Sequence, residues 1–309
     1  MTKLATYSAE DGPRLGIVRG GRIVDLRRAA EAFPPDVTVS PDWAMDSTGF
    51  LSAGEPALAA LSQVFDGVDR MDAGALRERR IAFDENSVAL LPPIPRPPKI
   101  ICVARNYGKH AEEAGRPISE IPIIFARFAK TLVAQGGQVV VPRVSHQLDW
   151  EGELAVVIGK PGRYISRNEG MDHVAAYSIF NDVTVRDYQF RVTQYTAGKN
   201  FAHSGPFGPY LVLRDEVPDP HALQITTRLN GEIVQSGNTR EMLFDIPTII
   251  EHISEFIDLE AGDVIPMGTP AGVGFTRSPP RFLKNGDVIA VEVEKLGVLT
   301  NPVTEEGGK

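Results

Sequence analysis

Three carboxylates lie within five residues near the middle of this chain, at Asp149, Glu151 and Glu153. Residues 154–158, which follow them, are apolar and partly β-branched, a composition typical of a buried strand. Because side chains alternate along a strand, a strand that begins at Asp149 would direct all three carboxylates to one face. Buried carboxylates need a positive partner, and Mg2+, Mn2+ and Ca2+ prefer carboxylate oxygen. The pattern favours a metal site; the alternative is a solvated strand end that carries surface acids.

A further acid, Asp182, closes the predicted strand at 177–184, where the sequence turns polar. Together with Glu151 and Glu153 it makes a set of three carboxylates without a histidine or cysteine at close spacing. Such a set favours Mg2+, Mn2+ or Ca2+ over zinc. Three protein oxygens would leave about three positions of an octahedron for water or for a chelating substrate.

An imidazole and a carboxylate are spaced three residues apart at His110 and Glu113, in a stretch expected to form a short helix. At this spacing the two side chains share one helix face. A carboxylate beside an imidazole fixes its tautomer and raises its basicity, which suits a general base that activates water. The alternative is a surface helix with a fortuitous ion pair.

Two further stretches are rich in glycine and proline. Lys199 lies in one of them, where its ammonium would stabilise an enolate or oxyanion near the metal; the alternative is a solvated lysine. The other stretch, 268–274, lacks the spacing and the lysine of a phosphate-binding loop. There the Thr269 hydroxyl and the backbone amides would meet a carboxylate, or the stretch is a structural turn.

The composition limits the classes of protein to consider. The chain has 309 residues, a formal net charge of -8 and an isoelectric point near 5.4, so no basic surplus is available to bind nucleic acid. A single cysteine, Cys102, rules out a disulfide within the chain and fits a reducing compartment. Without an apolar run of 18 residues or a signal pattern at its start, the chain is expected to be cytoplasmic, with no membrane partner and a small molecule as its ligand.

Predicted strands outnumber predicted helices, without a regular alternation between the two, so we expect a β-rich α+β fold, a roll or sandwich with a few helices. Residues 1–95 are expected to form a small N-terminal α+β domain, with a hairpin at Gly20-Gly21 and short helices near 26–33, 58–64 and 73–80. Five prolines in residues 91–98 make a stiff extended connector. The catalytic domain would then comprise residues 96–309.

The ordered set of motifs between residues 99 and 303 resembles the fumarylacetoacetate hydrolase family. The small N-terminal unit also resembles an extra domain that many bacterial members carry. The motifs are Asn106-Tyr-x-x-His110-x-x-Glu113, Asp149-x-Glu151-x-Glu153, Asn181-Asp182-x-Thr-x-Arg186-Asp187, Gly198-Lys199-x-Phe201, Gly268-Thr269-Pro270-x-Gly-Val-Gly274 and Leu283-Lys-x-Gly286-Asp287.

The resemblance implies a mixed β-sandwich roll, commonly a homodimer, that binds Mg2+ or Mn2+. It also implies a role for each matching side chain. The implied metal ligands are Glu151, Glu153 and Asp182. The implied catalytic residues are the lid dyad of His110 and Glu113, with Lys199 near the metal, and the implied substrate contacts are Gln189 and Thr269.

One position departs from the family pattern. Where related acylpyruvate hydrolases often have a lysine after the lid, this chain has Arg127. A guanidinium binds a carboxylate through two parallel hydrogen bonds, so we expect Arg127 to bind a distal carboxylate of the substrate.

These features together favour a metal-dependent hydrolase that cleaves the C–C bond of a 2,4-dioxo acid, either acylpyruvate-like or fumarylpyruvate-like, of the kind met in aromatic catabolism. His110, oriented by Glu113, would activate the attacking water, and pyruvate and a carboxylic acid would result. The alternative is a decarboxylase or an isomerase or tautomerase of a related 2-oxo acid on the same scaffold. A non-catalytic protein that binds metal and carboxylates is a further alternative.

Overall fold

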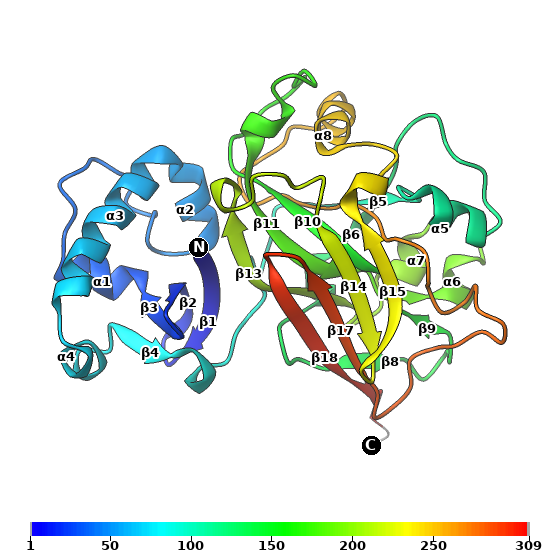
Figure 1. The fold of residues 1–309 in the computed structure, drawn as a ribbon, viewed down its shortest axis with the longest axis horizontal. Coiled ribbons are helices and arrows are strands. Elements are labelled where there is room, and N and C mark those ends of the chain that lie inside the picture. The colour runs from blue at the N-terminus through cyan, green and yellow to red at the C-terminus, as the bar shows by residue number, and fades with distance from the viewer. Residues whose placement is uncertain (1, 308–309) are drawn as a thin grey trace.

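Strands dominate the computed structural model, which describes residues 2–307, and Figure 1 shows the long strands gathered at the centre of the molecule. The helices lie around them. They are α1 (Leu26–Ala32), α2 (Ser47–Ala53), α3 (Glu55–Arg70), α4 (Ala73–Glu78), α5 (Gly108–Glu113), α6 (Arg186–Gln189), α7 (Thr196–Lys199) and α8 (Ile246–Ser254).

The larger sheet contains strands from the N-terminal unit and from most of the rest of the chain. Its spatial order is β4 (Ala82–Asp84), β3 (Arg22–Asp25), β2 (Gly12–Arg19), β1 (Lys3–Ala9), β13 (Gly205–Leu213), β11 (Val174–Asn181), β10 (Gly152–Ile158), β16 (Val264–Pro266), β5 (Ile100–Ala104) and β6 (Ile123–Arg127), with β7 (Leu132–Val133) beside β13.

The smaller sheets complete the fold. A five-stranded sheet has the order β15 (Glu232–Asn238), β14 (Gln224–Leu229), β17 (Val288–Val293), β18 (Gly297–Glu305) and β8 (Val139–Val141). A two-stranded sheet pairs β9 (Leu148–Asp149) with β12 (Thr184–Val185). The expected β-rich α+β class is confirmed.

The N-terminal unit is an antiparallel sheet covered by helices, seen in blue and cyan in Figure 1. Its β2–β3 hairpin turns at Gly20 and Gly21, whose φ angles of 57° and 73° lie in the left-handed region that such two-residue turns require. Strand β1 also pairs with β13, with Leu4 opposite Leu211, so the sheet continues into the rest of the molecule. The division at residue 95 stays a prediction, but the two parts share one sheet.

One hydrophobic core lies between the larger sheet and the five-stranded sheet. Strand β10 is buried at every residue, which explains why its sequence is almost continuously apolar. Helix α8 contributes buried isoleucines to the same core, including Ile249 and Ile253. This packing fixes β10 and β11 rigidly, and the acidic motifs lie at their ends. No helix within residues 2–307 is long and apolar enough to span a membrane.

Candidate active site

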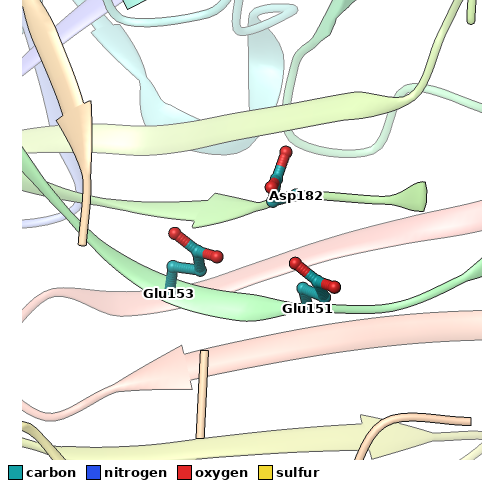
Figure 2. A group of neighbouring side chains, drawn as sticks. All are labelled: Glu151, Glu153 and Asp182. Atoms are coloured by element: carbon teal, nitrogen blue, oxygen red, sulfur yellow. The ribbon is translucent and has the colours of Figure 1, made fainter. Parts of the chain in front are cut away.

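The carboxylates of Glu151, Glu153 and Asp182 converge where β10 begins and β11 ends (Figure 2). Each offers an oxygen within 4.8 Å of the oxygens of the other two, and all three side chains are buried. The pairing of β10 with β11 sets this geometry: Gly152 lies opposite Asn181, and the Asp182 amide donates to the Glu151 carbonyl at 2.8 Å. The predicted carboxylate set is thus assembled by the strand register.

Three buried cations lie against two of these carboxylates. The Lys199 ammonium is 2.7 Å from Glu151 Oε2 and 2.6 Å from Asp182 Oδ2. Arg186 Nη1 is 2.6 Å from Glu151 Oε1, and Arg127 Nη1 is bonded to Asp182. Burial alone would raise the pKa of Glu151, but Lys199 and Arg186 more than offset this and hold it at about 2. Glu151 is therefore held as a carboxylate.

Glu153 differs from its two neighbours because no cationic side chain within residues 2–307 forms an ion pair with it. The Gly268 amide donates to Glu153 Oε2 at 2.8 Å. Burial, and then the adjacent charges of Asp182 and Glu151, raise the pKa of Glu153 well above its ordinary value. A buried carboxylate without a cationic partner, beside two carboxylates that have such partners, is the environment that a divalent cation would neutralise. The donor set fits Mg2+ or Mn2+, with Glu151, Glu153 and Asp182 as the residues that would hold it.

Above the carboxylates, α5 carries the predicted dyad. His110 Nδ1 is 2.9 Å from Glu113 Oε1, and the Gly272 amide donates to Glu113 Oε2 at 2.9 Å. Because Glu113 occupies Nδ1, Nε2 is the ring nitrogen left for proton transfer. The helix begins just after Asn106, whose side-chain amide is buried and bonded to the backbone of Phe244 and Met267. The dyad is thus tied both to the 268–274 stretch and to the sheet.

A cavity of about 50 Å³ is lined by His110 of the dyad and by the three carboxylates, and its wall includes Gln189 and Thr269. Gln189 Oε1 accepts from Arg186 Nη1 at 3.0 Å. The Thr269 hydroxyl donates to the Gly152 carbonyl at 2.9 Å and accepts from Gln235 Nε2. Both side chains are therefore fixed by protein contacts at the cavity wall, and their contact with substrate stays a prediction.

Arg127 has different partners from those its position in the sequence had suggested. Its guanidinium is fully buried, bonded to Asp182, to the Val183 carbonyl, and to the Ser204 carbonyl and hydroxyl. It does not line the cavity. Both Nη groups of Arg127 are used in this way, and its Nε is buried without a partner. Arg127 thus holds Asp182 in place and, outside the cavity lining, is not placed to bind a distal substrate carboxylate as expected.

Asp149 does not join the carboxylate set either. Strand β9 ends at Asp149 and β10 begins at Gly152, so the backbone is not one continuous strand through the acidic motif. The Asp149 carboxylate accepts from the Gly274 and Phe275 amides at 2.7 and 3.0 Å and from Arg186 Nε at 2.8 Å. The expectation that Asp149 shares a face with the glutamates was wrong, and its role is to anchor the loop at 274–275.

Several cationic and aromatic residues of the cavity were missed by the sequence reasoning. Arg186 was part of a motif without an assigned role, yet its buried Nη2 has no hydrogen-bond partner among the described residues and its side chain lines the cavity. Arg105, Arg116 and Phe190 line the cavity as well. No spacing rule marks them, because elements far apart in the sequence bring them together.

Comparison with known proteins connects this geometry to characterised relatives. The family model described as Fumarylacetoacetate (FAA) hydrolase C-terminal matches residues 99–304. The human protein named oxaloacetate tautomerase FAHD2A, mitochondrial, is 41% identical over 296 residues, covering 94% of this chain and 88% of that protein. Oxaloacetate tautomerase YisK of Bacillus subtilis is 45% identical over 225 residues, covering 72% of this chain and 75% of that protein.

Two solved structures share the fold over nearly the whole chain. The fumarylacetoacetate hydrolase from psychrophilic Exiguobacterium antarcticum is 32% identical with a TM-score of 0.77, covering 99% of this chain and 100% of that chain. The 2-hydroxyhepta-2,4-diene-1,7-dioate isomerase from Mycobacterium marinum is 28% identical with a TM-score of 0.73, covering 100% of both chains.

Proposed function

Because the chain belongs to the fumarylacetoacetate hydrolase family, we propose that this enzyme is a divalent-metal-dependent tautomerase, which interconverts the enol and keto forms of a small 2-oxo acid such as oxaloacetate. The observation that carries the proposal is that His110, bonded to Glu113, lines one cavity with the carboxylates of Glu151, Glu153 and Asp182. Tautomerisation requires one group that moves a proton and surroundings that favour an enolate, and this cavity offers both.

The dyad would move the proton. In the direction from enol to keto, the enol hydroxyl loses a proton, the C2–C3 double bond becomes single, and C3 gains a proton. His110 Nε2 is placed to take up and return that proton, since Glu113 holds Nδ1. When bound, a divalent cation would supply Lewis-acid stabilisation of negative charge on the 2-oxo acid. Lys199, whose ammonium is buried beside Glu151 and Asp182, adds a fixed positive charge in the same place.

The relatives support tautomerisation better than the hydrolysis that the sequence motifs favoured. Two relatives at 41% and 45% identity carry the name oxaloacetate tautomerase. Hydrolysis stays a second candidate, because the same dyad is suited to activate a water. The homodimer and the cytoplasmic location stay predictions, and the names of several relatives include the word mitochondrial.

The test is a tautomerase assay with oxaloacetate. Enol absorbance is followed after mixing, with Mg2+, with Mn2+ and with EDTA, and the keto form is measured with a coupled dehydrogenase. We expect metal-dependent acceleration of the interconversion with no loss of total oxaloacetate. Acetylpyruvate is tested in parallel, where release of acetate and pyruvate would establish hydrolysis instead. Loss of oxaloacetate to carbon dioxide and pyruvate would show a decarboxylase.

A further inference from the structure

Arg105 has an unusual place in the cavity wall. It follows the end of β5, where its φ of 54° lies in the left-handed region that few residues other than glycine adopt. Of its five donors, one is used in a described hydrogen bond, from Nη1 to the Pro117 carbonyl at 3.2 Å. Its Nε is buried without a partner, and no carboxylate within residues 2–307 forms an ion pair with it. Arg105 thus has unused hydrogen-bonding capacity and an uncompensated charge.

Arg116 lies near it, on the loop after α5. Its guanidinium is 5.8 Å from the centre of the Phe190 ring, and the Phe190 ring is 5.4 Å from that of Phe275. No ion pair joins Arg116 to a carboxylate in the part of the chain that the structure describes. Both arginines and both aromatic rings line the cavity that contains the carboxylate cluster. The aromatic rings form an apolar wall beside the Arg116 guanidinium.

The cations elsewhere in the site are already paired. Lys199 is held by Glu151 and Asp182, and Arg127 by Asp182. Arg186 is held by Asp149 and Glu151. The charge left without a protein partner therefore lies with Arg105 and Arg116.

We propose that Arg105, with Arg116 beside it, binds the distal carboxylate of a 2-oxo dicarboxylic acid and so determines the specificity of the enzyme. The inference rests on the proposed function, because it takes the 2-oxo acid end of the substrate to lie at the metal-binding carboxylates. A distal carboxylate would satisfy the buried Nε of Arg105 and pair with its charge. A monocarboxylic acid would leave that donor unpaired, which disfavours its binding.

The experiment compares two stable ligands that differ in this one group. Malate and 2-hydroxybutanoate are both four-carbon 2-hydroxy acids, and malate alone has a distal carboxylate. Calorimetry with Mg2+ gives the affinity of each for the wild type and for Arg105→Met, which keeps a long side chain and a Cβ at the strained position. We expect the wild type to prefer malate, and Arg105→Met to weaken malate roughly ten- to hundredfold. The affinity for 2-hydroxybutanoate should stay unchanged.

Lys109→Met is the matched control. It removes the same charge four residues further along the chain, but Lys109 is exposed, outside the cavity lining, with its Nζ 3.2 Å from Glu241 Oε2. Its ligand preference should equal that of the wild type. If thermal denaturation shows that Arg105→Met is not folded, Arg116→Met replaces it. We expect Arg116→Met to lose affinity for malate selectively as well, but by a smaller factor. Arg105→Lys should retain part of the preference, since it keeps the charge without the planar fork.

The outcomes separate this inference from the proposed function. A wild type that prefers malate without tautomerising oxaloacetate supports the carboxylate subsite and overturns only the tautomerase proposal. Tautomerase activity together with an equal effect of Arg105→Met on both ligands overturns the subsite alone. A wild type without preference for malate, or a Lys109→Met variant that loses the preference as strongly as Arg105→Met, also overturns the subsite.

Discussion

The floor of the cavity and the lid above it hold their side chains in different ways. The floor consists of Glu151, Glu153 and Asp182, which are between 1% and 5% exposed and lie at the ends of paired strands. The lid, residues 105–122, is a short helix and a loop that exposes Ile118 at 53% and Ile121 at 65%. Strand pairing and a buried core fix the floor, whereas the lid is held by the side chains of Asn106 and Glu113 and by a single β-bridge between Tyr107 and Met242.

This difference separates two parts of the chemistry. The floor fixes where a cation would lie, and stabilisation of an enolate is common to hydrolysis, decarboxylation and tautomerisation. The lid carries His110, the group proposed to move the proton, and the guanidinium groups of Arg105 and Arg116, which form no ion pair within residues 2–307. If His110 and Arg105 act as proposed, the lid mainly determines the reaction and the substrate. Substitutions in the floor should therefore impair metal binding, whereas substitutions in the lid should impair turnover or substrate preference.

The largest effect is expected in the floor, from Glu153→Gln. The substitution keeps the size of the side chain but removes a buried charge that no cationic side chain within residues 2–307 pairs with. Metal binding should be lost, and with it roughly 10^3-fold of activity, because a metal ion contributes several kcal/mol of charge stabilisation. The metal-free variant should be at least as stable as the metal-free wild type, since the desolvation cost of the charge is gone. Thermal denaturation with Mg2+ and with EDTA measures both, and a variant that Mg2+ still stabilises would contradict the assignment.

In the lid, His110→Ala should lower turnover by roughly 10^2- to 10^4-fold, the usual contribution of a general acid–base group. Metal binding should survive, because His110 lies on α5 and not among the three carboxylates. Calorimetric titration with Mn2+ measures metal binding and steady-state kinetics measures turnover, so the two together show whether His110→Ala affects turnover alone. Unchanged turnover would remove His110 from the mechanism, and lost metal binding would show that floor and lid are not independent.

A smaller effect is expected from Glu113→Gln. The amide oxygen can still accept from the Gly272 amide, but it cannot stabilise a protonated His110 as a carboxylate does. We expect turnover to fall roughly tenfold, in line with the loss of one charge-assisted hydrogen bond, with KM little changed. A fall in kcat/KM through KM alone would instead indicate that Glu113 only tethers the lid to Gly272.

The floor was predictable from the sequence because its signals are local. The period of two along a strand places Glu151 and Glu153 on one face, and the apolar run after them predicts burial. The same rule gave a wrong prediction for Asp149, because β9 pairs separately with β12 and the strand is interrupted between Asp149 and Gly152. Strand periodicity does not reveal where a backbone leaves one sheet for another.

The side-chain partners of the cavity arginines and the continuity of the larger sheet could not be predicted from local sequence patterns. Arg127 was given a substrate contact because its position suggested one, but its partners Asp182 and Ser204 come from distant segments. Arg105 and Arg116 have no marked spacing, and their significance follows from charges that are unpaired in three dimensions. Likewise, the pairing of β1 with β13 joins the N-terminal unit to the larger sheet across about two hundred residues of chain, which no hairpin or helix pattern predicts.

The smallest effect is expected between the two regions, at Asp245, which caps α8 directly after the Phe244 backbone that anchors Asn106. Its carboxylate accepts from the Thr248 amide at 2.9 Å, so Asp245→Ala should cost about 1 kcal/mol of stability. Burial raises the pKa of Asp245, but hydrogen bonds from Thr248 and Arg167 more than offset this and lower it.

A lowered folded-state pKa means that this stabilisation is complete above the unfolded pKa of about 4 and is lost as the pH falls through the folded value. The difference in unfolding free energy between wild type and Asp245→Ala should therefore narrow between pH 5 and the acid limit of denaturant titrations. Turnover should stay at the wild-type value, because the cap touches neither the carboxylates nor the dyad. A fall in turnover in a folded Asp245→Ala variant would show that α8 positions the lid through Phe244 and Asn106. The lid would then be fixed to the core as firmly as the floor is.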